Sequence, residues 1–226
     1  MRALTLVFDL DGTLVHTAPD LMATLNMILA REGAAPLPLE QANALIGGGA
    51  RVLLERGFAA NGRTIDEGHM AELYRDFLDH YAEHLAEHSR PYDGVEAALA
   101  RFQAEGHVLA VCTNKVTWHS RKLVEELGLA GSFKAVCGGD AFAWRKPDAR
   151  HLTMTIAEAG GDPARAVMVG DSITDVSAAR NAGIPVICVD FGYTDVPARE
   201  LGADAVVSHF SELDHTIRAI AARFGA

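Results

Sequence analysis

The stretch Leu4-Thr-Leu-Val-Phe-Asp-Leu-Asp-Gly-Thr-Leu14 is a short apolar run that ends at two carboxylates and a glycine. A continuous apolar run of this length, closed by turn residues, is typical of a central parallel strand covered on both faces. Side chains alternate along an extended chain, so Asp9 and Asp11 should point to the same side. Two carboxylates this close repel each other, which favours a nearby cation or a shared proton. Because ligands bind where the strands of an open α/β sheet end, the sequence predicts a functional site here.

The length and composition of the chain are those of an ordinary globular protein. Its 226 residues are 49% hydrophobic, which is enough for one large domain or two small ones. No apolar run approaches a membrane span, and the N-terminus enters a strand rather than a cleavable signal, so we expect a cytoplasmic protein with no membrane partner. The formal net charge of -10 argues against a nucleic-acid partner. The three cysteines, whose spacing suits neither disulfides nor zinc, are expected to be buried thiols: Cys112, Cys137 and Cys188.

The periodicity of the chain changes from strand-like to helical between Pro19 and about His88, and no convincing strand interrupts this block. From Val95 onward, apolar strands alternate with helices, which implies a parallel, doubly wound sheet with right-handed crossovers. We expect the later strands at residues 107–112, 135–137, 166–170, 185–189 and 205–207, and a last helix from about Phe210 to Phe224. The sequence therefore predicts an α/β, Rossmann-like core of residues 1–15 and 92–226, with an all-helical cap domain of residues 16–91 inserted after the first strand.

A glycine run, Ile46-Gly-Gly-Gly-Ala-Arg51, lies inside the helical block. Gly48 and Gly49 open a helix there, and the exposed backbone N–H groups of a helix start favour an anion. Arg51, in the first turn, could grip a carboxylate or a second phosphate with two parallel hydrogen bonds. The same residues are equally consistent with a flexible turn that leaves Arg51 in solvent.

Three further strand ends carry polar side chains. Thr113 and Asn114 follow the second core strand, Lys146 precedes a proline, and Asp171 and Asp175 flank a helix start, four residues apart. Taken singly, each has a structural explanation as a turn residue, a surface cation or a helix cap. Their joint occurrence at successive ends of a parallel sheet instead predicts one shared site.

These motifs, in this order, resemble those of the haloacid dehalogenase (HAD) superfamily over essentially the whole chain. The matching residues are Asp9 to Val15, Thr113, Lys146 and Gly170 to Asp175, and a helical cap between the first two motifs resembles the C1-capped branch of the superfamily. The resemblance implies a phosphotransferase in which Asp9 is the nucleophile and Asp11 the general acid and base. It further implies that Thr113 and Lys146 hold the phosphate oxygens.

Mg²⁺ is the cofactor that this resemblance implies. Its expected ligands are Asp9, the backbone carbonyl of Asp11, and Asp171, since Mg²⁺ prefers hard oxygen donors. Asp175 should either support these ligands or bind directly. The implied activity is hydrolysis of a phosphate monoester through an aspartyl phosphate on Asp9.

The first motif and the glycine run look like those of the phosphoglycolate phosphatase subgroup, which predicts 2-phosphoglycolate or another small phosphorylated metabolite as substrate. Asn114, Gly48, Gly49 and Arg51 are then the candidate substrate-binding residues, and Arg51 could bind the carboxylate. His16 departs from the Asp usual in that subgroup; it either lines the cap hinge or faces solvent, and we favour solvent. A sugar phosphomutase, a pyrophosphatase and a non-enzymatic phospho-acceptor remain alternatives, and the chain could be a monomer or a homodimer.

Overall fold

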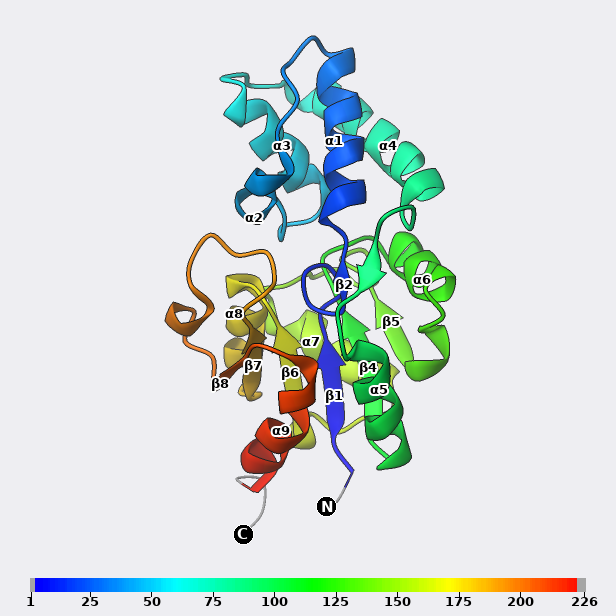
Figure 1. Ribbon diagram of the computed structural model, residues 1–226, viewed down its shortest axis with the longest axis vertical. Coiled ribbons are helices and arrows are strands. Elements are labelled where there is room, and N and C mark those ends of the chain that lie inside the picture. Colours follow the sequence, from blue (N-terminus) through cyan, green and yellow to red (C-terminus); the bar gives the residue numbers. More distant parts are fainter. Residues whose placement is uncertain (1–2, 223–226) are drawn as a thin grey trace.

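A central parallel sheet organises the protein, whose computed structural model describes residues 3–222 (Figure 1). The strand order is β5-β4-β1-β6-β7-β8. The strands are β1 (Thr5–Phe8), β4 (Val108–Cys112), β5 (Ala135–Cys137), β6 (Ala166–Gly170), β7 (Val186–Val189) and β8 (Ala205–Val207). Every neighbouring pair is parallel, and Phe8 lies opposite both Val111 and Val169. The predicted doubly wound α/β sheet is confirmed, with the first strand at its centre.

Helices cover both faces of this sheet. They are α5 (Val95–Ala104), α6 (Thr117–Glu126), α7 (Ala149–Glu158), α8 (Ile173–Ala182) and α9 (Leu213–Ala221), with short 3₁₀ turns at Ala130–Ser132, Pro163–Arg165, Ala198–Glu200 and Phe210–Glu212. Alternation along β1 sends Leu6 and Phe8 into one apolar core and Val7 into a second one on the opposite face. The last helix was predicted from about Phe210, where the structure has a 3₁₀ turn, and its predicted end at Phe224 lies outside the described residues.

Four further helices gather beyond the carboxyl ends of the strands (Figure 1). They are α1 (Ala18–Arg31), α2 (Ala42–Leu45), α3 (Ala50–Ala60) and α4 (Glu67–His84), with a 3₁₀ turn at Leu39–Gln41, and we call them the cap helices. Leucines and aromatic residues at helical spacing, among them Leu25, Leu73 and Phe77, pack their inner faces together. None of the helices in residues 3–222 combines the length and the apolar character that crossing a membrane requires.

A two-stranded ribbon joins the cap helices to the sheet. Strand β2 (Val15–His16) pairs antiparallel with β3 (Arg90–Pro91), so the chain leaves the core and returns to it at one place. These strands were not predicted, because two residues are too few to show a pattern. His16 does not simply face solvent: its Nδ1 lies 2.9 Å from the Tyr193 hydroxyl. The three cysteines are buried free thiols, as predicted.

Candidate active site

The end of β1 places both carboxylates of the first motif. The Asp9 backbone N–H still bonds Val169 of the sheet at 2.9 Å, and the chain then turns through Gly12, whose φ of +82° is one that glycine adopts readily. Asp9 is buried, whereas the Asp11 side chain keeps 16% of its surface exposed. The turn therefore carries one enclosed carboxylate and one that reaches the adjoining pocket.

Lys146 is the cation beside the enclosed carboxylate. Its Nζ lies 2.9 Å from Asp9 Oδ1 and 2.6 Å from Asp175 Oδ1, and its side chain is only 1% exposed. Burial opposes the charged form, but Asp175 and Asp9 outweigh it and raise the pKa of Lys146, so the group is an ammonium ion. Burial likewise raises the pKa of Asp9 to about 6, against the lowering effect of Lys146.

Asp171 is held from two sides at the end of β6. The Thr13 hydroxyl donates to its Oδ1 at 2.8 Å, and the Tyr193 backbone N–H donates to its Oδ2 at 2.6 Å. A Cβ added to Gly12 would lie 2.4 Å from Asp171 Oδ2, and one added to Gly192 would lie 2.2 Å from Asp171 Cβ. Burial, with the nearby Asp175 and Asp9, raises the pKa of Asp171 well above its usual range.

Asp175 closes the cluster from the first turn of α8. Its Oδ2 accepts hydrogen bonds from the Ser172 hydroxyl at 2.6 Å and from the backbone N–H groups of Ser172 and Asp171 at 3.0 and 3.2 Å. Asp9, Asp171 and Asp175 each offer an oxygen atom, and these atoms lie within 4.8 Å of one another. Three buried carboxyl groups share one lysine, and burial together with their mutual repulsion raises the pKa values of Asp9 and Asp171. Three hard oxygen donors crowded in this way fit a divalent cation.

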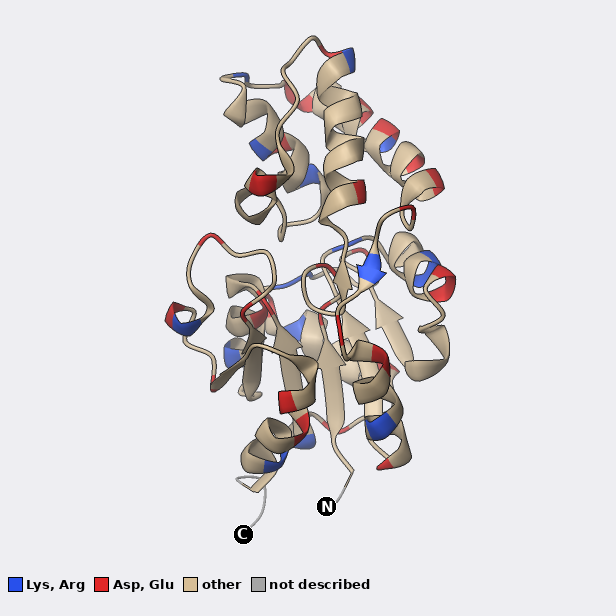
Figure 2. Ribbon diagram, viewed as in Figure 1, with Lys and Arg blue, Asp and Glu red and all other residues tan. Residues whose placement is uncertain are grey.

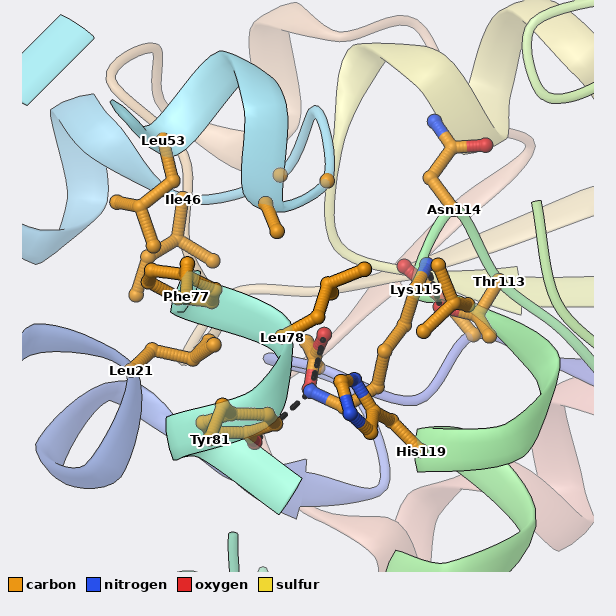
Figure 3. Close-up of a pocket in the computed structure, with 16 residues that line it drawn as sticks. Leu21, Ile46, Leu53, Phe77, Leu78, Tyr81, Thr113, Asn114, Lys115 and His119 are labelled. Carbon is orange, nitrogen blue, oxygen red and sulfur yellow. Dashed lines mark hydrogen bonds and ion pairs between the residues drawn. The ribbon is translucent and has the colours of Figure 1, made fainter. Parts of the chain in front are cut away.

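Thr113 and Asn114, at the end of β4, both line the adjoining pocket. The Thr113 Oγ1 accepts the Lys115 backbone N–H at 3.3 Å. The Asn114 amide donates to the Lys146 backbone carbonyl at 3.1 Å, while its Oδ1 is buried without a partner among the described residues. The Asn114 side chain points away from Tyr81 and Lys115 (Figure 3). The structure thus brings Thr113 close to the carboxylates and gives Asn114 a bond to the loop that carries Lys146.

The pocket lies between the strand ends and the cap helices (Figure 3). The core supplies its polar side, including Asp9, Asp11 and Thr113. The cap helices and the loop before α3 supply an apolar wall, made of Leu21, Ile46, Leu53, Phe77 and Leu78. Gly49 fits closely against the core: a Cβ there would lie 3.1 Å from the Asn114 carbonyl oxygen. The glycine run therefore lets the cap backbone approach the end of β4.

The structure does not bring Arg51 or Gly48 to this pocket. Gly49 and Ala50 line it, but Arg51 turns outward and pairs with Glu55 at 2.9 Å and with Glu67 at 2.5 Å. More than a third of the Arg51 side chain is exposed. Of the residues predicted to bind substrate, only Asn114 and Gly49 line the pocket.

Sequence reasoning missed Lys115, Tyr81 and His119. The Lys115 Nζ lies 3.0 Å from Asp11 Oδ1 and donates to the Tyr81 hydroxyl at 2.8 Å, which links α4 of the cap to the strand end. His119 packs edge-on against Tyr81, and burial with the nearby charge of Lys115 lowers its pKa to about 4. Lys115 directly follows Thr113 and Asn114 in the sequence, and that adjacency was the available signal.

Comparison with known proteins places this chain in a family. Residues 6–189 match the model of the haloacid dehalogenase-like hydrolases. The phosphoglycolate phosphatase of Mesorhizobium japonicum is 51% identical to it over 92% of each chain, and that of Caulobacter vibrioides is 46% identical over 94% of this chain and 90% of its own. The crystal structure of a predicted phosphoglycolate phosphatase from Haemophilus somnus superimposes with a TM-score of 0.89 at 29% identity, covering 96% of this chain and 98% of the other.

The chain belongs to the haloacid dehalogenase-like hydrolase family. Its relatives and its fold define it further as a phosphoric monoester hydrolase. The predicted fold, family and enzyme class are thereby confirmed, and the alternative of a non-enzymatic phospho-acceptor is excluded.

Proposed function

We propose that this enzyme hydrolyses 2-phosphoglycolate, or a closely similar short phosphate ester with a carboxylate, and that it uses Mg²⁺. The observation that carries the proposal is the buried cluster of Asp9, Asp171, Asp175 and Lys146, which meets a pocket walled by apolar cap side chains. A sugar phosphate would turn hydroxyl groups toward that wall, where they would lack hydrogen-bond partners. The relatives named phosphoglycolate phosphatase support the small substrate.

In the proposed reaction, the carboxylate of Asp9 attacks the phosphorus atom. The bond from phosphorus to the ester oxygen breaks, and an aspartyl phosphate forms on Asp9. Asp11, which reaches the pocket from the same turn, gives a proton to the departing alkoxide. Asp11 then takes a proton from water, whose oxygen attacks the phosphorus and releases phosphate from Asp9.

The other residues of the cluster hold the reacting groups. In this proposal Lys146 and the Thr113 hydroxyl neutralise and orient the phosphate oxygens. Asp9, the Asp11 carbonyl and Asp171 would hold Mg²⁺, which when bound supplies Lewis-acid stabilisation of the charged phosphate. Asp175 has both oxygens engaged by Lys146 and by the start of α8, so in this proposal it supports the site rather than binding the ion.

Residues 16–91 act in this proposal as a cap domain over a core of residues 1–15 and 92–226. Closure over a bound ester would exclude water that is not the nucleophile. We also propose that the protein is cytoplasmic and has no nucleic-acid or membrane partner, as the composition predicts.

The experiment is Mg²⁺-dependent phosphate release from a panel of 2-phosphoglycolate, sugar phosphates, nucleotides and pyrophosphate. We expect kcat/KM for 2-phosphoglycolate to exceed the others by about a hundredfold, which corresponds to roughly 2.7 kcal/mol of transition-state binding. A preference for sugar phosphates or pyrophosphate would refute 2-phosphoglycolate as the substrate but would still agree with a hydrolase. Turnover that depends on a bisphosphate primer would indicate a mutase instead.

A further inference from the structure

Lys115 is a buried cation that the proposed reaction does not use. Only 5% of its side chain is exposed, and its Nζ lies 3.0 and 3.2 Å from the two oxygens of Asp11. It also donates to the Tyr81 hydroxyl at 2.8 Å and lies 4.3 Å from the centre of the Tyr81 ring. The residue thus sits between the carboxylate expected to protonate the leaving group and the cap helix α4.

Lys115 is also the single lysine or arginine among the described residues that line the pocket. Lys146 is not among the residues that line the pocket; it contacts Asp9 and Asp175, and the proposed reaction assigns it to the phosphate. Arg51 is paired outside the pocket with Glu55 and Glu67. His119 lines the pocket, but with its pKa lowered to about 4 it is neutral at physiological pH. An anionic group on the substrate, beyond the phosphate itself, therefore has Lys115 as its cation.

We propose that Lys115 binds the carboxylate of the substrate and so sets the preference for short acidic esters; this rests on the proposed function. In 2-phosphoglycolate, one methylene separates the carboxylate from the ester oxygen. Asp11 must reach that ester oxygen, and Lys115 lies in direct contact with Asp11. The separation between the proton donor and the cation therefore fits a substrate of this length.

The hydrogen-bonding capacity of Lys115 allows this additional partner. An ammonium group has three N–H donors, and the Lys115 ammonium faces three acceptor atoms, the two Asp11 oxygens at 3.0 and 3.2 Å and the Tyr81 hydroxyl at 2.8 Å. A substrate carboxylate would take over the N–H that now points to the more distant Asp11 oxygen, while Asp11 keeps the shorter bond. Leu78 and Phe77, which line the pocket beside Tyr81, would keep water from competing for the pair.

The test compares 2-phosphoglycolate with ethyl phosphate, which has a methyl group in place of the carboxylate. Lys115→Met removes the charge and keeps an unbranched side chain of similar length. We expect its kcat/KM for 2-phosphoglycolate to fall roughly 10- to 100-fold more than its kcat/KM for ethyl phosphate, as for the loss of a charged hydrogen bond. Lys122→Met, on the exposed side of α6 where Lys122 pairs with Glu126, is the control and should change neither value.

If Lys115 only positioned Asp11, Lys115→Met would lower kcat/KM equally for both esters, and that result would overturn the proposal. The proposal would also be overturned if Arg51→Ala lowered kcat/KM for 2-phosphoglycolate alone and Lys115→Met did not. If Lys115→Met does not fold, Lys115→Gln removes the same charge with a polar side chain and is held to the same criterion.

A binding measurement separates this proposal from the proposed function. In an Asp9→Asn background, calorimetric titration with Mg²⁺ present should give tighter binding of 2-phosphoglycolate than of ethyl phosphate, and Lys115→Met should remove that difference. If the enzyme hydrolysed other esters better than 2-phosphoglycolate but this binding difference remained, the proposed substrate would be wrong and the binding of a carboxylate by Lys115 would stand. If the Asp9→Asn protein with Lys115 in place bound the two esters equally, the binding of a carboxylate by Lys115 would be refuted.

Discussion

The two sides of the pocket are built from opposite kinds of side chain. The core side buries four ionisable side chains, those of Asp9, Asp171, Asp175 and Lys146, which contact one another and backbone N–H groups. The cap side faces the same space with leucine, isoleucine and phenylalanine. The cap helices are not short of charge, since acidic residues recur along α4 (Figure 2), but those charges lie away from the pocket.

This contrast separates bond breaking from substrate selection. Charge that must stabilise a transition state has to be fixed in place, and a sheet with a register set by β1, β4 and β6 fixes it. An apolar wall instead discriminates against substrates with polar groups on that side, because a polar group turned toward it loses hydrogen bonds to water. Lys115 stands where the two sides meet, because it contacts Asp11 of the core and Tyr81 of the cap.

The largest effect is expected for Asp9→Asn, which removes the proposed nucleophile from the core side. An amide is a poor nucleophile of nearly the same shape, so we expect hydrolysis of every ester to fall about 10⁴-fold or more. The variant should fold, because it removes a buried negative charge without changing the packing. Phosphate release and thermal unfolding measure the two effects, and a variant with near-normal turnover would show that the core side does not supply the nucleophile.

A second test concerns the stability of the core side. Lys146→Met leaves Asp9 and Asp175 buried without their cation, which should lower the free energy of unfolding by about 3–5 kcal/mol in metal-free protein. Lys122→Met, which removes an exposed ion pair, should cost about 0–1 kcal/mol. Urea unfolding of both variants provides the comparison. Equal, small losses would mean that the carboxylates are not held by Lys146.

The smallest expected effect is a pH dependence of the stability, which arises from His119 at the contact between the core side and the cap side. The pKa of His119 is about 4 in the folded protein, against 6.5 for a histidine in the unfolded chain, so between these pH values the unfolded chain binds a proton that the folded one does not. Stability should therefore fall as the pH drops from 7 to 5.5, with His119 contributing about 1 kcal/mol of the fall.

His119→Phe keeps an aromatic ring against Tyr81 and should remove that contribution. The exposed His215, replaced by Gln, is the matched control for the loss of one histidine. Urea unfolding at the two pH values, at a fixed magnesium concentration, gives the difference. An unchanged slope in His119→Phe would mean that the folded protein protonates this ring as readily as the unfolded chain does.

The parts that the sequence could predict are those written as short local patterns. An apolar run that ends in Asp9 and Asp11 predicted the central strand, and polar residues at later strand ends predicted that Thr113, Lys146 and Asp171 lie near them. Parallel strands bring their carboxyl ends to one edge, so no knowledge of the distances was needed. The helical block likewise followed from apolar residues at three- and four-residue spacing.

The direction of individual side chains could not be predicted in the same way. Arg51 follows Gly49 and Ala50, which both line the pocket, yet one step along the helix turns it toward Glu55 and Glu67. A pattern locates the helix start but not its rotation about the helix axis relative to the core. Tyr81 lies among the buried residues of α4, but its contact with Lys115 joins residues 34 positions apart that no local pattern connects.

The two glycines around Asp171 also determine what the binding of a cation costs. Gly12 and Gly192 pack closely against the Asp171 side chain, and hydrogen bonds from Thr13 and Tyr193 hold its two carboxylate oxygens. Its side-chain entropy is therefore lost when the chain folds and not when the ion arrives. Folding itself thus bears the entropic cost of preparing this ligand, and an arriving ion meets a carboxylate that is already oriented.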